Sequence, residues 1–266
     1  MKLTKRIKIG LSLVGLSAAV LLNGIMATSS SAASEQEMID PDAEKVLTEM
    51  SEYLGGLSKF SADFDASTDI ITSQGQKIKL AQSGNFLVSR PDKFRVTRLG
   101  EFAETEFILD GEQLTLHGLK INGYFQTQAT TIEEAIAIVR DDIGLEAPVA
   151  DLLIAKPLDM AMTDITTGSH IGMTTVGGAT VHHLAFRGSL VDWQIWIKDG
   201  EEPLPVKYVI TSKFVAGAPE YALLITNWNT DPQIDEGSFT FTPPADAKLI
   251  TSVTVNVIGN ATNVSE

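Results

Sequence analysis

The chain has 266 residues, with 34 acidic and 20 basic side chains, so its formal net charge at pH 7 is −14. A balance this negative disfavours nucleic acid and anionic membrane surfaces as partners. The absence of cysteine excludes disulfide bonds and a thiol that could carry a lipid anchor. With 44% hydrophobic residues, the chain is long enough to form one well-packed domain.

Residues 1–33 have the order of a secretion signal. Basic residues precede an apolar run at 9–22, and small residues follow as far as Ala33. We expect cleavage near Ala33 and release into the periplasm as a soluble protein. A membrane anchor is the alternative, but the run is shorter than the ~20 residues that span a bilayer.

The segment after this signal predicts an amphipathic helix over about 41–54. Pro41 opens it, Gly55 and Gly56 stop it, and apolar residues recur between them at helical spacing. Residues 59–128 are then predicted to form a series of short strands. The turn residues between them are Gly75, Gly100, Asp110-Gly111 and Asn122-Gly123. This pattern favours an antiparallel meander.

A helical segment at about 131–156 interrupts the strands. Thr130 or Thr131 can cap a first helix that ends at Gly144, and a second, mostly apolar helix follows Pro148. Strands return after residue 164, with the clearest hairpin turns at Gly177-Gly178 and Asp199-Gly200. In the strand VDWQIWIK, we expect Trp193, with Val191 and Ile195, to face the core.

The helices are too few to cover both faces of so long a sheet. Such a sheet must curl to bury its apolar side. We therefore predict a mostly β (α+β) single domain over 34–266, a curved antiparallel half-barrel whose helices close the opening. The polar end, 251–266, is predicted to be a flexible, partly ordered tail.

Four motifs occur in order along the chain. They are FSADF at 60–64, a strand with Gly84 leading to Arg90-Pro91-x-x-Phe94, LDG at 109–111, and FTFTPP at 239–244. This set resembles the LolA family of periplasmic lipoprotein carriers and a related group of uncharacterised periplasmic proteins. The resemblance spans about 44–250 and implies a curved barrel whose apolar cavity shields acyl chains beneath a helical lid.

The resemblance also assigns a role to Arg90, which lies in the basic stretch SRPDKFRV. It implies that this arginine is a latch, hydrogen-bonded to carbonyls of the lid, and we place those carbonyls near Ile143 or Ala155. A guanidinium has five donors and keeps its charge, so it can satisfy the last carbonyls of a helix. The alternative is a solvated strand residue, which we also assign to Lys93, Arg95 and Arg98.

Alternation along neighbouring strands places further apolar side chains on the concave face. We expect these residues to line a ligand pocket of roughly several hundred Å3, the size common for ligand sites: Phe86, Val88, Phe94 and Val96. The resemblance puts Phe94 at the cavity mouth.

The chain departs from the lipoprotein-carrier pattern in its length, its acidic helical segment and its longer C-terminal end. We therefore predict a lipid, an acyl chain or an acylated protein as the ligand of a monomeric carrier or chaperone. A membrane-associated donor or acceptor protein is expected as a transient partner. The alternatives are an envelope sensor or scaffold domain that binds a protein, and a hydrolase whose site carries no recognisable motif.

The sequence contains no motif typical of catalysis. The histidines lack a metal-ligand spacing, and no nucleophile elbow, phosphate loop or dinucleotide fingerprint occurs. His182 and His183 are adjacent in a predicted strand, so they point to opposite faces. We accordingly assign no catalytic residue, no metal site and no cofactor.

Overall fold

The computed structural model describes residues 39–145, 150–156, 162–251, 253–255 and 261–263. The predicted signal segment 1–33 lies outside these residues. Residues 37–266 form one compact unit. No helix among the described residues is long and apolar enough to cross a membrane.

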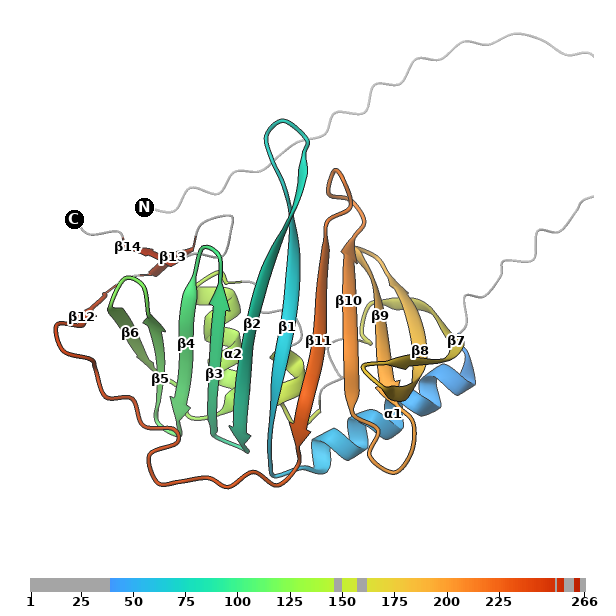
Figure 1. Cartoon of the computed structure of the whole chain (residues 1–266), viewed down its shortest axis with the longest axis horizontal. Helices are drawn as coiled ribbons and strands as arrows, with labels where there is room; N and C mark the ends of the chain where they lie inside the picture. Colours follow the sequence, from blue (N-terminus) through green and yellow to red (C-terminus); the bar gives the residue numbers. More distant parts are fainter. Residues whose placement is uncertain (1–38, 146–149, 157–161, 252, 256–260, 264–266) are drawn as a thin grey trace, which may run out of the picture. The chain divides into compact units, whose positions relative to one another are not determined.

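A twelve-stranded sheet dominates the unit, and eleven of its strands form two antiparallel meanders (Figure 1). The first meander contains β1 (Lys59–Ile71), β2 (Lys77–Ser89), β3 (Lys93–Gly100), β4 (Glu104–Asp110), β5 (Gln113–Gly118) and β6 (Gly123–Gln128). The second contains β7 (Ile165–Val176), β8 (Ala179–Gly188), β9 (Val191–Lys198), β10 (Pro205–Ser212) and β11 (Glu220–Asn229). The two meanders join where β1 pairs antiparallel with β11.

The remaining strands are short. β12 (Lys248–Leu249) pairs parallel with β6 at one edge of the sheet. β13 (Val253–Val255) and β14 (Ala261–Asn263) pair with each other, within the segment predicted to be a tail.

The first helix, α1 (Pro41–Gly56), begins at the capping side chain of Asp40, which accepts a hydrogen bond from the backbone N–H of Asp42. It ends two residues beyond the predicted limit. The segment between the meanders forms α2 (Ile132–Ala137), capped by Thr131, and continues as one turn of π-helix, η1 (Ile138–Asp142). The second predicted helix is only a 3-10 turn, η2 (Ala150–Leu153).

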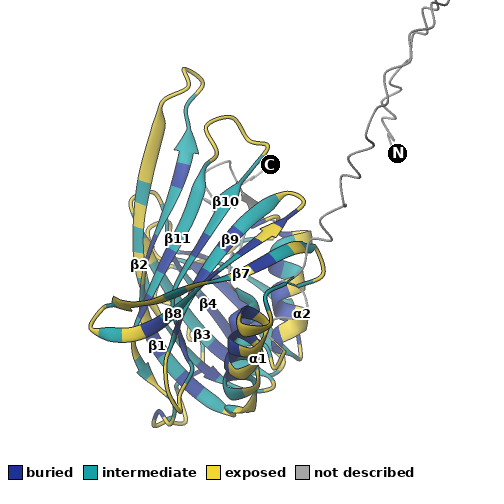
Figure 2. Cartoon of the chain, turned by 90° about the vertical axis from the view of Figure 1, so that its right-hand side faces the viewer, coloured by how far each residue is buried: buried dark blue, intermediate teal, exposed yellow. Residues whose placement is uncertain are grey.

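The sheet curls, and both α-helices lie inside the curve (Figure 2). Buried residues of α1 pack against β8 and β9, including Trp193 and Ile195, as their alternation predicts. Buried residues of α2, η1 and η2 pack against strands of the first meander. The prediction of a mostly β, antiparallel half-barrel is therefore confirmed, with the helices on its concave face.

A chain segment covers part of the opposite, convex face. After β11, residues 230–247 run past the lower end of the strands to β12 (Figure 1). Phe239 in this segment is buried, and the ring of Phe241 lies 5.2 Å from those of His117 and Tyr124. Because of this cover, His117 is a buried side chain although it faces away from the helices.

The burial of Phe239 predicts a large loss of stability when its ring is removed. Phe239→Ala should lower the free energy of unfolding by about 3 kcal/mol, because a cavity replaces the ring. Phe214→Ala is the matched control, since Phe214 is 77% exposed, and it should change stability by less than about 0.5 kcal/mol. Urea denaturation measures both, and equal midpoints would contradict the anchoring role of Phe239.

Candidate functional site

The concave face of the first meander brings the four predicted pocket residues together. Phe86 pairs with Val96, and Val88 pairs with Phe94, so all four side chains share one face of β2 and β3. Val88 and Phe94 are buried, whereas Phe86 and Val96 are partly buried. The structure thus gives these residues one location, at the centre of the apolar cluster that α2 and η1 cover.

An aromatic group extends this apolar face toward the centre of the sheet. The ring of Phe86 lies 6.1 Å from that of Phe60, 6.5 Å from that of Phe64 and 5.5 Å from that of Trp228. Phe64 pairs directly with Gly84, where an added Cβ would lie 2.6 Å from the Phe64 ring. The glycine in the predicted motif therefore leaves room for an aromatic ring across the sheet.

The sequence analysis missed Trp228. Simple alternation along β11 would place this side chain on the convex face, together with Thr226 two residues earlier. In the structure, Asn227 has a positive φ of 53° and the pairing of β1 with β11 shifts register at this point. A bulge of this kind turns the following side chains to the other face. An asparagine within a strand is the signal that could have indicated the bulge, since asparagine tolerates this conformation.

Arg90 lies in the turn directly after β2 and contacts both helical segments. Its guanidinium donates hydrogen bonds to carbonyls at the C-terminus of α1, including that of Leu57 at 2.8 Å. It also donates to carbonyls of η2 and the residue after it, including that of Leu153 at 2.9 Å and that of Ile154 at 2.6 Å. The complete set of acceptors is Leu54, Gly55, Leu57, Leu152, Leu153 and Ile154.

The acceptors differ from those expected at the sequence level. The bonds fall next to Ala155 and not at Ile143, and the contacts with α1 were not predicted. The last turn of α1 contains no basic residue of its own, so Arg90 supplies the positive charge that stabilises exposed carbonyls at a helix end. Burial lowers the pKa of Arg90 to about 10, an effect that Glu133 opposes. The guanidinium therefore stays charged at neutral pH.

Two other contacts stabilise the region where Arg90 joins α1 to η2. The guanidinium of Arg90 lies 4.8 Å from the centre of the Phe60 ring, a cation–π distance. In the helical segment, Arg140 of η1 and Asp151 of η2 form a two-point ion pair at 2.9 and 3.0 Å. This pair links the two parts of the segment at about 131–156.

The assignment of Arg95 and Arg98 to a solvated strand face is wrong. Arg95 forms an ion pair with Glu106 at 2.8 Å and donates a hydrogen bond to the carbonyl of Ser238 at 3.0 Å. Arg98 has the same strand parity as Phe94, so it lies on the concave side, where burial lowers its pKa. Burial likewise raises the pKa of the neighbouring Tyr221 to about 12, an effect that Arg98 opposes. Arg98 therefore adds a cationic group to the apolar residues of the concave face.

Three of the four histidines make polar contacts within the protein. His182 lies 3.1 Å from His170 and 3.0 Å from Asp199, whereas His183 bonds to Gln194 and stacks on Trp196. Within the described ranges, no group of three or more His, Asp or Glu side chains is arranged to hold a metal ion.

Comparison with known proteins identifies a family. A family model described as "Predicted periplasmic protein (DUF2092)" matches residues 43–253. The chain therefore belongs to this family, and the periplasm expected from residues 1–33 is also the location that the family description gives. No curated protein matches the sequence.

Several solved structures are similar at low identity. The lipoprotein LppX from Mycobacterium tuberculosis is 12% identical, with a TM-score of 0.46 over 74% of this chain and 100% of that chain. MucB from Pseudomonas aeruginosa, in complex with MucA, is 14% identical, with a TM-score of 0.43 over 76% and 61%. A LolA superfamily protein from Nitrosomonas europaea is 8% identical, with a TM-score of 0.36 over 75% and 97%.

The close approach of α1 to the residues after η2 depends on Gly55. A Cβ at Gly55 would collide with the carbonyl oxygen of Ala155, whereas a Cβ at Gly56 would meet nothing within 4 Å. Gly55→Ala should therefore destabilise the protein by about 1–3 kcal/mol. Gly56→Ala is the adjacent control and should be neutral or stabilising by up to about 1 kcal/mol. Thermal or urea unfolding compares the two variants, and the same change in both would refute this packing.

Proposed function

We propose that the protein is a periplasmic carrier or chaperone that binds an apolar molecule on its concave face. The ligand class is a lipid, an acyl chain or an acylated segment of another protein. The main support is the aromatic group of Phe64, Phe86 and Trp228, whose rings stay partly exposed on a face where neighbouring apolar residues are buried. Partly exposed aromatic side chains on a concave surface are typical of sites for apolar ligands.

In this proposal the segment at about 131–156 is a lid, and the pocket of roughly several hundred Å3 expected at the sequence level lies beneath it. Ile132, Ile136 and Val139 pack on the strands in the way that a lid would. Arg90 is the latch, since its donors reach both α1 and the end of the lid segment. Displacing the lid would require these charge-assisted bonds to break, so the latch sets how readily a ligand enters.

The ligand proposal predicts a specific effect of Phe86. Phe86→Asp should weaken binding of the neutral apolar dye N-phenyl-1-naphthylamine at least about tenfold, because a carboxylate would be buried in the binding face. Asn85→Asp places the same carboxylate on the opposite face of β2 and should leave the affinity unchanged. Fluorescence titration measures both affinities, and mass spectrometry of a solvent extract of the purified wild-type protein should detect lipid.

Two results would contradict the proposal. The first is equal dye affinity in the wild type and in Phe86→Asp. The second is an extract without lipid, combined with a wild type that does not bind the dye.

The latch predicts a loss of protection at two segments. Arg90→Leu should speed amide hydrogen exchange around 54–57 and 150–154, and it should lower stability by roughly 2–4 kcal/mol, since several bonds to a charged group are lost. Arg90→Lys should restore little, because an ammonium lacks the planar fork. Arg187→Leu is the control, since Arg187 is exposed on β8. If exchange at the two segments is the same in Arg90→Leu and in the control, Arg90 is not a latch.

A further inference from the structure

Five hairpin turns lie at one end of the sheet. Because neighbouring strands run antiparallel, the turns of β1–β2, β3–β4, β5–β6, β8–β9 and β10–β11 all fall at the same end. We call this end the hairpin rim, and it comprises residues 72–76, 101–103, 119–122, 189–190 and 213–219. It is opposite to the end where Arg90 holds the helices.

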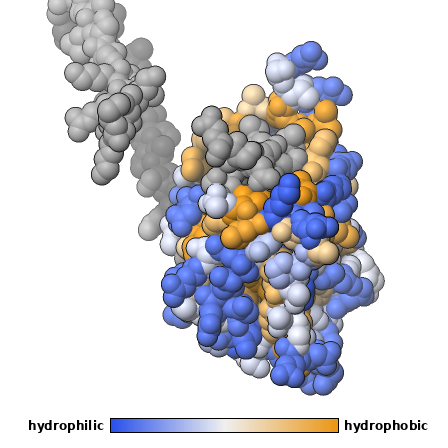
Figure 3. All heavy atoms as spheres, turned by 90° about the vertical axis from the view of Figure 1, so that its left-hand side faces the viewer, coloured by the Kyte–Doolittle hydropathy of each residue, from blue (hydrophilic) through white to orange (hydrophobic). Residues whose placement is uncertain are grey.

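Large exposed apolar side chains gather at this rim. Phe214 and Leu190 are the most exposed, at 77% and 67%. Among the described residues, all large exposed apolar side chains except Ile171 and Met173 of β7 lie in the rim turns or in strand ends beside them: Ile78, Leu99, Phe102, Leu119, Ile121, Leu190, Phe214, Val215 and Leu249. Figure 3 shows apolar surface in the upper part of the molecule, below an uppermost tip that is itself hydrophilic, and a more hydrophilic surface toward the other end.

Turn geometry does not require these apolar residues. The turns at the opposite end have the usual polar composition, with Pro91-Asp92, Gly111-Glu112, Gly177-Gly178 and the stretch 199–204. The exposed parts of these apolar side chains contribute little to the stability of the fold, and together they form a patch of the kind that marks interaction sites. Their position on one end therefore indicates a surface that they contact.

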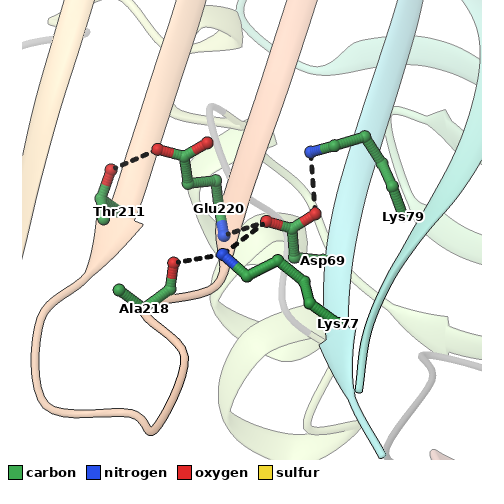
Figure 4. A network of polar contacts seen from close by, with 6 residues as sticks. All are labelled: Asp69, Lys77, Lys79, Thr211, Ala218 and Glu220. Atoms are coloured by element: carbon green, nitrogen blue, oxygen red, sulfur yellow. Dashed lines mark hydrogen bonds and ion pairs between the residues drawn. The ribbon is translucent and has the colours of Figure 1, made fainter. Parts of the chain in front are cut away.

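A polar network holds the two longest rim hairpins together (Figure 4). Asp69 of β1 is buried and lies 2.8 Å from Lys79 and 3.4 Å from Lys77. Asp69 also accepts a hydrogen bond from the backbone N–H of Glu220, and Lys77 donates to the carbonyl of Ala218 in the β10–β11 turn. Burial raises the pKa of Asp69, but these bonds outweigh it and the pKa is lowered. The turn that carries Phe214 is thus fixed against β1–β2.

The charges at the two ends differ. The rim turns contain Lys120 and Lys213, with Glu101 as their acidic residue. The turns at the opposite end contain five acidic residues, with Arg90 as their basic one: Asp92, Glu112, Asp199, Glu201 and Glu202. Strands of up to 13 residues separate the ends, which is roughly 40 Å. Salt screens charges beyond about 10 Å, so the acidic turns at the opposite end have little effect on contacts at the rim.

We propose that the hairpin rim docks onto a phospholipid bilayer. Phe214, Leu190 and Phe102 would enter the boundary between headgroups and acyl chains. Lys120 and Lys213, which pair with Glu104 at 3.2 Å and Asp192 at 3.1 Å, would exchange these partners for lipid phosphates. The apolar side chains stand on separate turns, an arrangement that a fluid surface accommodates more readily than a protein partner with matching pockets. This surface lies apart from the ligand face, so its role does not depend on the ligand.

Sedimentation with vesicles tests the docking. The protein, expressed with its native N-terminus and purified from the periplasm of a bacterial host, is mixed with vesicles of phosphatidylethanolamine and phosphatidylglycerol. The double variant Leu190→Ser/Phe214→Ser should bind at least about tenfold more weakly than the wild type, because two large apolar groups no longer enter the bilayer. The double variant Ile171→Ser/Met173→Ser removes apolar groups that are 59% and 53% exposed but lie away from the rim, and it should bind like the wild type.

Three outcomes would overturn the proposal. The wild type could fail to sediment with vesicles, the rim variant could bind as well as the wild type, or the β7 variant could lose as much binding as the rim variant. Dye binding, measured on the same samples, should be equal in all three proteins. A loss of vesicle binding with normal dye binding therefore assigns the defect to the rim and leaves the ligand proposal to its own test.

Discussion

The hydrogen bonds of Arg90 connect three parts of the chain that are distant in sequence. One guanidinium, in the turn after β2, joins the C-terminus of α1 to η2 and the residue after it, and its face lies over the ring of Phe60. Each acceptor is a carbonyl at or near the end of a helical turn, where the backbone has no further partner within the helix. Without this charge, α1 and η2 would bring their unsatisfied carbonyls together at one place.

The curl of the sheet determines what the helices can cover. Buried residues of α1 pack on the second meander, and α2 with η1 packs on the first. Between these two contacts lies the aromatic group around Phe86, whose rings remain partly exposed. The proposed ligand face thus follows from how the helices divide the concave surface, and Gly84 and the bulge at Asn227 decide which rings reach it.

The two ends of the half-barrel differ in chemistry, which is relevant to the proposed carrier function. At one end, Arg90 joins the helical segments, and the turns are acidic. At the other end, apolar side chains and lysines stand on hairpin tips. If the rim contacts a bilayer, the proposed latch at Arg90 points away from the membrane, so docking and opening of the proposed lid would be separate events at opposite ends of the strands.

The sequence alone determined the class of fold and the orientation of most strand residues. Alternation identified the concave residues of β2 and β3 and the core position of Trp193, because period-two patterns are local and one face must be buried. The same rule was misapplied to Arg98. This residue lies four positions after Phe94, so alternation places it on the concave face and not on the face of Arg95. The rule also missed Trp228, because a single bulged residue reverses every position that follows.

Only the tertiary structure decided which distant groups meet. The basic residues around Arg90 look alike in sequence, yet Arg90 meets two helix ends, while Arg95 meets Glu106 and a carbonyl of residues 230–247. Likewise, the apolar residues of the rim are scattered along the chain, and only strand order brings their turns to one end. Local pattern fixes the face of a strand on which a side chain lies, but its partners depend on contacts between segments far apart in sequence.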